Sequence, residues 1–163
     1  MSNSQNAAAS TEATFFVERI FNASRDKVFA AYTQPEHIKQ WWAPRPWHLS
    51  HCSVDLRPGG EWRYCMAGPD GEEAWGKATY REIVPPERLV YEDAFTDADG
   101  NVNPALPVSV TTITFEDLGD GKTRMSAVAV FPTPEALRAV IDMGMEEGMN
   151  MCLDQLAELL ATL

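Results

Sequence analysis

The stretch "EWRYCMAGPDGEEAWGKATYREIVPPERLVYED", residues 61–93, decides the fold of this chain. Apolar and aromatic residues alternate with polar ones, which is the period of a strand with one buried face. The alternation is interrupted at Pro69-Asp70-Gly71 and at Pro85-Pro86, and both interruptions are typical of turns. The stretch therefore predicts three consecutive antiparallel strands joined by hairpins.

The same alternation extends to both sides of this stretch. Turn residues recur at Pro58-Gly59-Gly60, Asp99-Gly100 and Asp120-Gly121. Because the glycines of the first of these turns join two strands and do not open a helix, they do not form a phosphate-binding loop. Between the turns, the sequence predicts six strands over residues 48–57, 60–67, 74–84, 88–95, 107–117 and 122–131.

The residues before this region predict one strand and two short helices. The segment "TFFVERIF" at residues 14–21 is rich in β-branched and aromatic side chains, as strands are. Ser24 is a typical helix N-cap. Thr33 and Glu36 have the spacing of a capping box, which predicts the start of a second short helix.

The last segment predicts one long helix that runs to the C-terminus. Thr133 is a typical cap residue, and Pro134 fits the first helical position. Charged residues recur every fourth position on one side, opposite an apolar stripe that must cover the sheet. The apolar stripe consists of Leu137, Ile141, Met145, Gly148, Cys152, Leu156, Leu159 and Leu163.

Together these elements predict an α+β fold. We expect a curved seven-stranded antiparallel sheet wrapped around a long C-terminal helix, with two short helices between the first and second strands. A length of 163 residues is typical of one domain. We expect residues 14–163 to form this domain and the small, polar residues 1–13 to be a disordered tail.

The composition argues against several classes of partner. The chain has 13 Lys and Arg against 24 Asp and Glu, a net charge of −11, which would repel nucleic acid. No signal peptide or membrane span is recognisable, so we expect a cytoplasmic protein without a membrane span. The cysteines have no pairwise spacing typical of disulfide frameworks or zinc sites, and we expect free thiols. They are Cys52, Cys65 and Cys152.

The last predicted helix contains two glycines, one of which, Gly148, belongs to the apolar stripe. Gly144 and Gly148 lie four residues apart and would stack on one face of a helix. One explanation is a close approach of the helix to the sheet. The other is a notch for an apolar ligand, lined by flexible methionine side chains. These methionines are Met143, Met145, Met149 and Met151.

Several stretches occur in the order and spacing of a known family. They are "FNASRDKVFAAYTQPEHIKQWW", "CSVDLRPGGEWRY", "PDGEEAWGKATYREIVPPERLVYED", "VTTITFEDLGDGKTRM" and "GMNMCLDQLAELL". Through them, residues 14–163 resemble the bacterial homologues of the activator of the heat-shock-protein-90 ATPase, which belong to the START-like (SRPBCC, Bet v 1-like) superfamily of helix-grip folds. The resemblance implies a hydrophobic cavity between the long helix and the sheet, in which apolar molecules bind or react. Gly148-Met149 stands where family members often have Gly-Trp.

Sharper chemistries are less well supported by the residues. His48, His51 and Cys52 do not share one strand face, so we expect no metal and no cofactor. A carboxylate facing the cavity would have a raised pKa and could move protons, as an enzyme of the cyclase or hydrolase type requires. The candidates for this role are Glu61, Glu92 and Asp93.

The function that we expect is the binding of a hydrophobic small molecule in the cavity. Trp41 and Trp42 close the second short helix, and they either plug one end of the sheet or act as a lid over the cavity. The alternatives are a small-molecule enzyme with a cavity acid or base and a co-chaperone that activates a heat-shock-protein ATPase; a homodimer is expected if an edge strand is exposed. The expected ligand-binding residues are Trp42, Cys52, Val54, Trp62, Tyr64, Tyr80, Tyr91, Phe95, Met145, Gly148, Met149 and Cys152.

Overall fold

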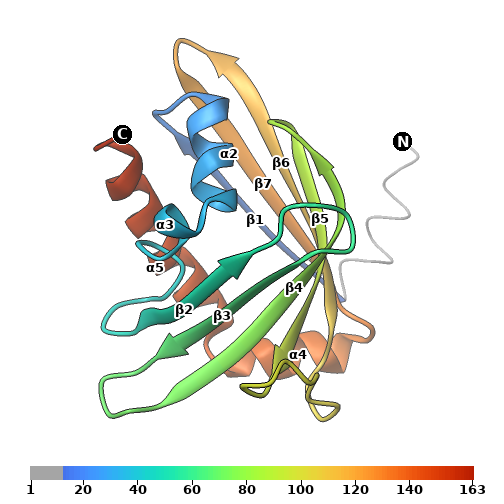
Figure 1. The fold of residues 1–163 in the computed structure, drawn as a ribbon. Helices are drawn as coiled ribbons and strands as arrows, with labels where there is room; N and C mark the ends of the chain where they lie inside the picture. The colour runs from blue at the N-terminus through green and yellow to red at the C-terminus, as the bar shows by residue number, and fades with distance from the viewer. Residues whose placement is uncertain (1–12) are drawn as a thin grey trace, which may run out of the picture.

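The computed structural model of the protein describes residues 13–163. The tail expected at residues 1–13 therefore lies, apart from Ala13, outside the described residues. Helices and strands follow one another along the described chain as Figure 1 shows. In order, they are β1 (Thr14–Phe21), α2 (Arg25–Thr33), α3 (Pro35–Ile38), β2 (His48–Val54), β3 (Glu61–Ala67), β4 (Glu73–Val84), β5 (Arg88–Thr96), β6 (Ser109–Gly119), β7 (Lys122–Val130), α4 (Pro134–Asp142) and α5 (Met145–Leu160).

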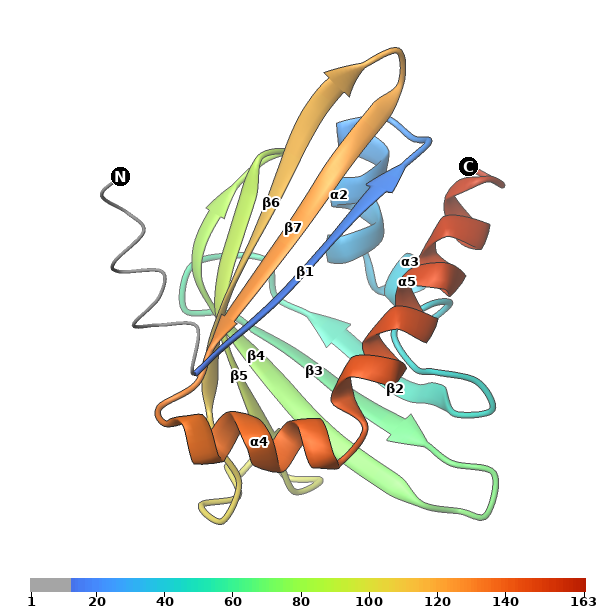
Figure 2. The same ribbon diagram turned by 180° about the vertical axis from the view of Figure 1, so that it is seen from behind.

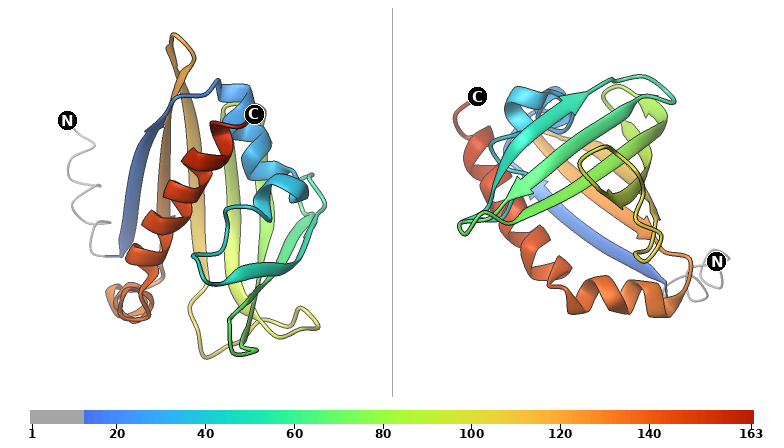
Figure 3. Two further views of the ribbon diagram at one scale, coloured as in Figure 1. Left: turned by 90° about the vertical axis from the view of Figure 1, so that its left-hand side faces the viewer. Right: turned by 60° about the horizontal axis from the view of Figure 1, so that its bottom comes forward.

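The strands form one antiparallel sheet of seven strands, as the sequence predicts. Its order is β1-β7-β6-β5-β4-β3-β2, so strands β2 to β7 are sequential neighbours and β1 pairs with β7. The register shifts between Leu49 and His51 in β2 and between Tyr80 and Glu82 in β4. Such bulges bend strands, and the sheet curves around α5 (Figure 3). The predicted α+β class is confirmed, with α2 and α3 between the first two strands.

The C-terminal segment differs from the prediction of one continuous helix. Its start is as expected, because Thr133 accepts a hydrogen bond from the backbone N–H of Ala136 and Pro134 lies in the first turn of α4. The chain then turns at Gly144, whose φ of 90° is a left-handed conformation that an α-helix cannot continue through. A second helix, α5, begins there and runs in a different direction from α4 (Figure 2).

The two short helices α2 and α3 connect β1 to β2. Ser24 caps α2 as predicted, since its side chain accepts a hydrogen bond from the backbone N–H of Lys27. The capping box expected from Thr33 does not form, and α3 has Gln34 as an N-cap without a side-chain hydrogen bond. The reason is that Thr33 still belongs to α2, where its hydroxyl donates a hydrogen bond to the carbonyl of Phe29 at 2.9 Å.

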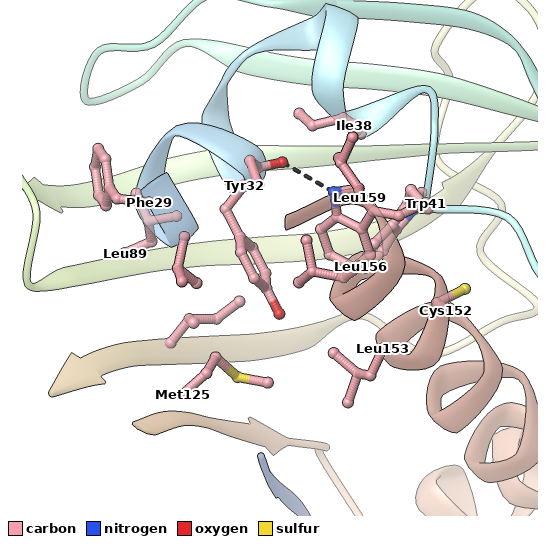
Figure 4. Packing of buried hydrophobic residues seen from close by; sticks show 14 of the residues in the cluster. Phe29, Tyr32, Ile38, Trp41, Leu89, Met125, Cys152, Leu153, Leu156 and Leu159 are labelled. Atoms are coloured by element: carbon pink, nitrogen blue, oxygen red, sulfur yellow. Dashed lines mark hydrogen bonds between the residues drawn. The ribbon is translucent and has the colours of Figure 1, made fainter. Parts of the chain in front are cut away.

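The main hydrophobic core lies under α2 and α3 and is shown in Figure 4. The Tyr32 ring packs against Trp41 and Phe115, with centroids 4.8 Å and 5.3 Å away. From the opposite side, α5 contributes Leu153 and Leu156, which have no exposed surface. We call this region, defined by these five residues and their buried neighbours, the packed end.

Hydrogen bonds tie the segment after α3 to α5 beside the packed end. Gln155 is buried, and its Nε2 donates to the carbonyls of Trp41 and Ala43 at 3.1 Å and 2.9 Å. Its Oε1 accepts from the backbone N–H of Arg45 at 3.0 Å. The indole Nε1 of Trp41 donates to the carbonyl of Ala31 at 2.9 Å. Because these buried polar groups have partners, the segment is held firmly against the helix.

Several ion pairs lie on the outer surface. Arg57 forms an ion pair with Asp55 at 2.9 Å. Similar pairs join Arg81 to Glu92, Arg88 to Glu82 and Arg124 to Glu116. None of the described helices is both long and apolar enough to cross a membrane.

Candidate functional site

A cavity of about 530 Å³ lies between the sheet and the helical layer, next to the packed end. On the helical side, it is lined by Val140, Met143, Gly144, Met145, Gly148, Met149 and Cys152. On the sheet side, its apolar wall includes Phe15, Val17, Met66, Phe95, Ile113, Ala127 and Ala129. The cavity is therefore bounded by α4, the first half of α5 and the concave face of the sheet.

The glycines of the C-terminal segment have separate roles. Gly144 is the left-handed residue before α5, so the expected stacking with Gly148 on one helix is wrong. A Cβ added to Gly148 would meet Pro44 Cγ at 3.7 Å, which is ordinary contact. A close approach of the backbone to the sheet does not explain this glycine. Its missing side chain instead leaves room at the cavity wall.

The methionines divide between the cavity and the surface. Met143, Met145 and Met149 line the cavity, as expected. Met151 does not, because it lies on the outer side of α5 and is 41% exposed. Met143 is 59% exposed as well as lining the cavity, so the cavity reaches the surface at the turn between α4 and α5.

The strand register brings polar side chains into the otherwise apolar wall. Tyr91, Asp93 and Phe95 alternate along β5, and all three line the cavity. On the neighbouring strand β6, Ser109 is paired with Asp93 and Thr111 with Tyr91, and both hydroxyl residues also line it. Tyr91, Asp93, Ser109 and Thr111 therefore form a small polar group in the middle of the sheet. We call these four residues the polar cluster.

Tyr64 reaches the polar cluster from β3. Its hydroxyl donates a hydrogen bond to Oδ1 of Asp93 at 3.3 Å, across the intervening strand β4. Gly76 lies opposite Tyr64 in β4, and a Cβ there would lie 2.6 Å from the Tyr64 hydroxyl oxygen. Because Cβ atoms do not approach that closely, glycine at this position allows the tyrosine to cross β4.

Burial changes the acidity of the polar cluster. It raises the pKa of Asp93 from 3.8 to about 7, although hydrogen bonds from Tyr64 and from the backbone N–H of Ala94 act in the opposite direction. Burial and the nearby Asp93 carboxylate raise the pKa of Tyr64 and of Tyr91 well above the ordinary value. Asp93 is consequently charged in only part of the molecules near neutral pH.

The cavity wall offers this carboxyl no cation. Among the described residues that line it, there is no Lys, Arg or His, and Asp93 is the one carboxyl. The Cys152 thiol is also in the wall, but burial raises its pKa to about 12. A thiol of this kind stays protonated and is a poor nucleophile.

The cavity brings together most of the residues that the sequence predicts for ligand binding. Those that line it are Trp42, Tyr64, Tyr91, Phe95, Met145, Gly148, Met149 and Cys152. Trp62 and Tyr80 belong instead to the packed end, where they are 2% and 1% exposed, and Cys52 and Val54 pack against the same cluster. These four share the concave face, but α2, α3 and the tryptophans cover that part of it.

Trp42 forms the border between the packed end and the cavity. Its ring centroid lies 5.3 Å from that of Trp41 and 4.8 Å from that of Trp62, and its side chain also lines the cavity. Trp41 itself is completely buried. In this structure Trp42 is a wall of the cavity.

The other chemical candidates lie away from the cavity. Glu61 forms an ion pair with Lys77 at 3.4 Å, and Glu92 pairs with Arg81. His51 is exposed, with its ring centroid 5.5 Å from that of Trp75. Nowhere in residues 13–163 do three or more His, Cys, Asp or Glu side chains gather in a way that could hold a metal.

Sequence reasoning missed part of the cavity wall. Ser109 and Thr111 were not expected there, although their alternation in β6 is visible in the sequence. Phe15 alternates with Val17 in the same way at the sheet edge. Trp47 lies in an irregular segment, where no period indicates which way a side chain points.

The chain is similar to a known protein family. Residues 22–161 match the family model described as "Activator of Hsp90 ATPase homolog 1-like protein". A search among curated proteins found no match.

Several solved structures share the fold over nearly the whole chain. A protein from Nitrosomonas europaea is 32% identical, with a TM-score of 0.81, over 93% of this chain and 96% of that one. A protein from Mycobacterium smegmatis is 33% identical, with a TM-score of 0.84, over 92% and 91% of the two chains. A protein from Arthrobacter aurescens is 30% identical, with a TM-score of 0.87, over 94% and 89%.

Proposed function

The chain belongs to the Activator of Hsp90 ATPase homolog 1-like family, and from this premise we propose that it binds an apolar small molecule in the cavity between α5 and the sheet. The observation that carries the proposal is the cavity itself. Its volume of about 530 Å³ is within the range of about 300–1,000 Å³ that is usual for small-molecule sites.

The composition of the wall supports an apolar ligand. Aromatic and aliphatic side chains form most of it, and a few polar groups converge at one place, as in binding sites for small organic molecules. Met145 and Met149 have flexible, polarisable side chains that adapt to ligands of different shape. The exposed Met143 at the turn between α4 and α5 supports an entrance there.

Filling the cavity tests this proposal. The uncharged fluorophore N-phenyl-1-naphthylamine should gain fluorescence on entering the wild-type cavity. Met145→Trp adds bulk inside the cavity, so we expect it to reduce the affinity for this probe at least about tenfold. Met151→Trp is the matched control, because it adds the same side chain on the exposed side of the same helix.

The comparison of the two tryptophan variants decides the outcome. Equal affinity of Met145→Trp and Met151→Trp for the probe, with both proteins folded by circular dichroism, would refute binding in this cavity. Loss of binding in the first variant alone would support it.

A second candidate function is acid–base catalysis on the bound molecule. The observation that favours it is the hydrogen-bonded pair of Tyr64 and Asp93 inside the cavity. A carboxyl with a pKa near 7 suits proton transfer at neutral pH. If a compound that copurifies with the protein is converted by it, Asp93→Asn should abolish the conversion. The co-chaperone alternative is supported by the family description alone.

A further inference from the structure

We propose, building on the cavity as a binding site, that its ligand is an apolar molecule carrying a protonated amine, whose nitrogen pairs with Asp93. The polar cluster defines the chemistry of one end of the ligand, and the apolar wall defines the rest. The inference rests on where Asp93 lies, on what surrounds it and on the charge of the whole chain.

The position of Asp93 leaves it able to accept further hydrogen bonds. Tyr64 donates a hydrogen bond to Oδ1, and the backbone N–H of Ala94 donates another to the carboxyl, whereas a carboxylate has about four acceptor positions. Asp93 is half-buried and lines the cavity, so the remaining positions face the space where a ligand lies. Gly76 holds this arrangement by leaving room for the Tyr64 ring.

The surroundings of Asp93 lack a positive charge. The titratable groups that face it are the hydroxyls of Tyr64 and Tyr91 from the sheet, with Tyr32 from α2 and the thiol of Cys152 from α5 also in the wall. All of these are neutral at physiological pH, because burial raises their pKa values. A carboxylate that is partly removed from water and has no cation nearby is unfavourable, and a ligand cation that pairs with it would offset part of that penalty.

A protonated amine fits the acceptors of the polar cluster. An ammonium group carries three N–H donors and no acceptor. Besides Asp93, the hydroxyl residues Ser109 and Thr111 line the same wall, and Ser109 is the direct cross-strand partner of Asp93. Side chains paired in this way have Cβ atoms about 5 Å apart, a separation that one ammonium group can bridge.

The charge of the chain favours a cation over a fatty acid. With a net charge of −11, the field around the protein attracts cations and repels carboxylates. A fatty acid would also place a second carboxylate beside Asp93, which like-charge repulsion opposes. A ligand with a neutral hydroxyl in place of the ammonium group would form a hydrogen bond with Asp93 but would gain nothing further from its charge.

Displacement by three matched ligands tests the inference. Decylamine, decanol and decanoate share one alkyl chain and differ only in their polar group. Each competes with N-phenyl-1-naphthylamine for the full-length protein, about one pH unit above the pKa of Asp93. We expect decylamine to bind at least about tenfold more tightly than decanol, as charge-assisted hydrogen bonds do, and decanoate to bind weakest.

Substitution of Asp93 separates the two proposals. In Asp93→Asn, and in Asp93→Leu if the first variant is unstable, the preference for decylamine should disappear, while decanol binds at least as well as before. If decanol or decanoate matches decylamine in the wild type, the amine inference is wrong and the cavity site stands. If the probe does not bind and none of the three compounds binds, the proposed function itself is wrong.

Discussion

The packed end and the cavity lie under the same helix and on the same face of the same sheet, yet one is solid and the other hollow. In its second half, α5 presents Leu153 and Leu156, which are fully buried against Tyr32, Trp41 and Phe115. In its first half, it presents Gly148 and flexible methionines to open space. The helix backbone is similar in both halves, so the side chains and the covering helices make the difference.

The two ends have different roles. The packed end buries apolar surface and holds α5 in place, as hydrophobic cores do. The cavity end leaves apolar surface unfilled, which reduces stability and provides a site for a ligand. Substitutions at the two ends should therefore separate stability from binding.

The largest expected effect is at the packed end. Leu156→Ala should lower the free energy of unfolding by about 3 kcal/mol, because it opens a void among fully buried neighbours. Met145→Ala should lower it by less than about 1 kcal/mol, since its side chain already borders empty space. Urea denaturation measures both values. Equal losses would contradict the distinction between the two ends.

The next effect concerns Gly76 in β4, the strand between β3 and β5. Gly76→Ala places a Cβ against the Tyr64 ring and should cost about 1–3 kcal/mol of stability. It should also separate Tyr64 from Asp93, and the pKa of Asp93 should then rise further, because the lost hydrogen bond lowers it. NMR titration of the Asp93 carboxyl carbon follows this pKa. An unchanged pKa in a folded variant would argue against the positioning role of Gly76.

A smaller effect is expected in the pH dependence of stability. The pKa of Asp93 is higher in the folded state than in the unfolded state, so the folded protein binds more protons between about pH 4 and pH 7. The contribution of Asp93 to the free energy of unfolding is therefore most favourable below pH 4, where the carboxyl is protonated, and this favourable contribution is lost as the pH rises to 7. The free energy of unfolding of Asp93→Asn, measured relative to that of the wild type, should therefore increase by about 1–2 kcal/mol when the pH is raised from 5 to 8.

Urea denaturation of the two proteins at both pH values gives this difference directly. Other titrating groups are common to both proteins and cancel. A difference in unfolding free energy that does not change with pH would mean that Asp93 is solvated like a surface carboxylate.

Much of the fold follows from the sequence because apolar and polar residues alternate along the strands. The period in residues 61–93 predicts β3, β4 and β5 and their hairpins, and the structure has all of them. The break at Gly144 does not follow from the sequence pattern, because apolar residues keep helical spacing on both sides of it and a positive φ does not change that spacing.

The candidate site could be predicted only in part, for a related reason. Alternation places Tyr91, Asp93 and Phe95 on one face, and that face does line the cavity. Alternation does not tell which part of the face is covered, and Trp62 and Tyr80 were therefore assigned to the cavity although they belong to the packed end. That assignment depends on α2 and α3, whose position over the sheet is a matter of tertiary packing.

The smallest effect has the opposite sign. Gly148→Ala adds a Cβ that meets only Pro44, at an ordinary 3.7 Å. It should raise the free energy of unfolding by about 0.5–1 kcal/mol, because alanine favours a helix more than glycine does. A loss of stability in thermal denaturation would mean that the backbone there is packed more tightly than the structure indicates.

The most direct test of the cavity as a binding site uses the methionine methyl groups as reporters in NMR. N-phenyl-1-naphthylamine should shift the signals of Met66, Met145 and Met149, which line the cavity, along one saturable curve. The signals of Met125, buried in the packed end, and Met151, exposed outside, should stay in place. Shifts confined to Met151, or no saturable shift at all, would contradict the account.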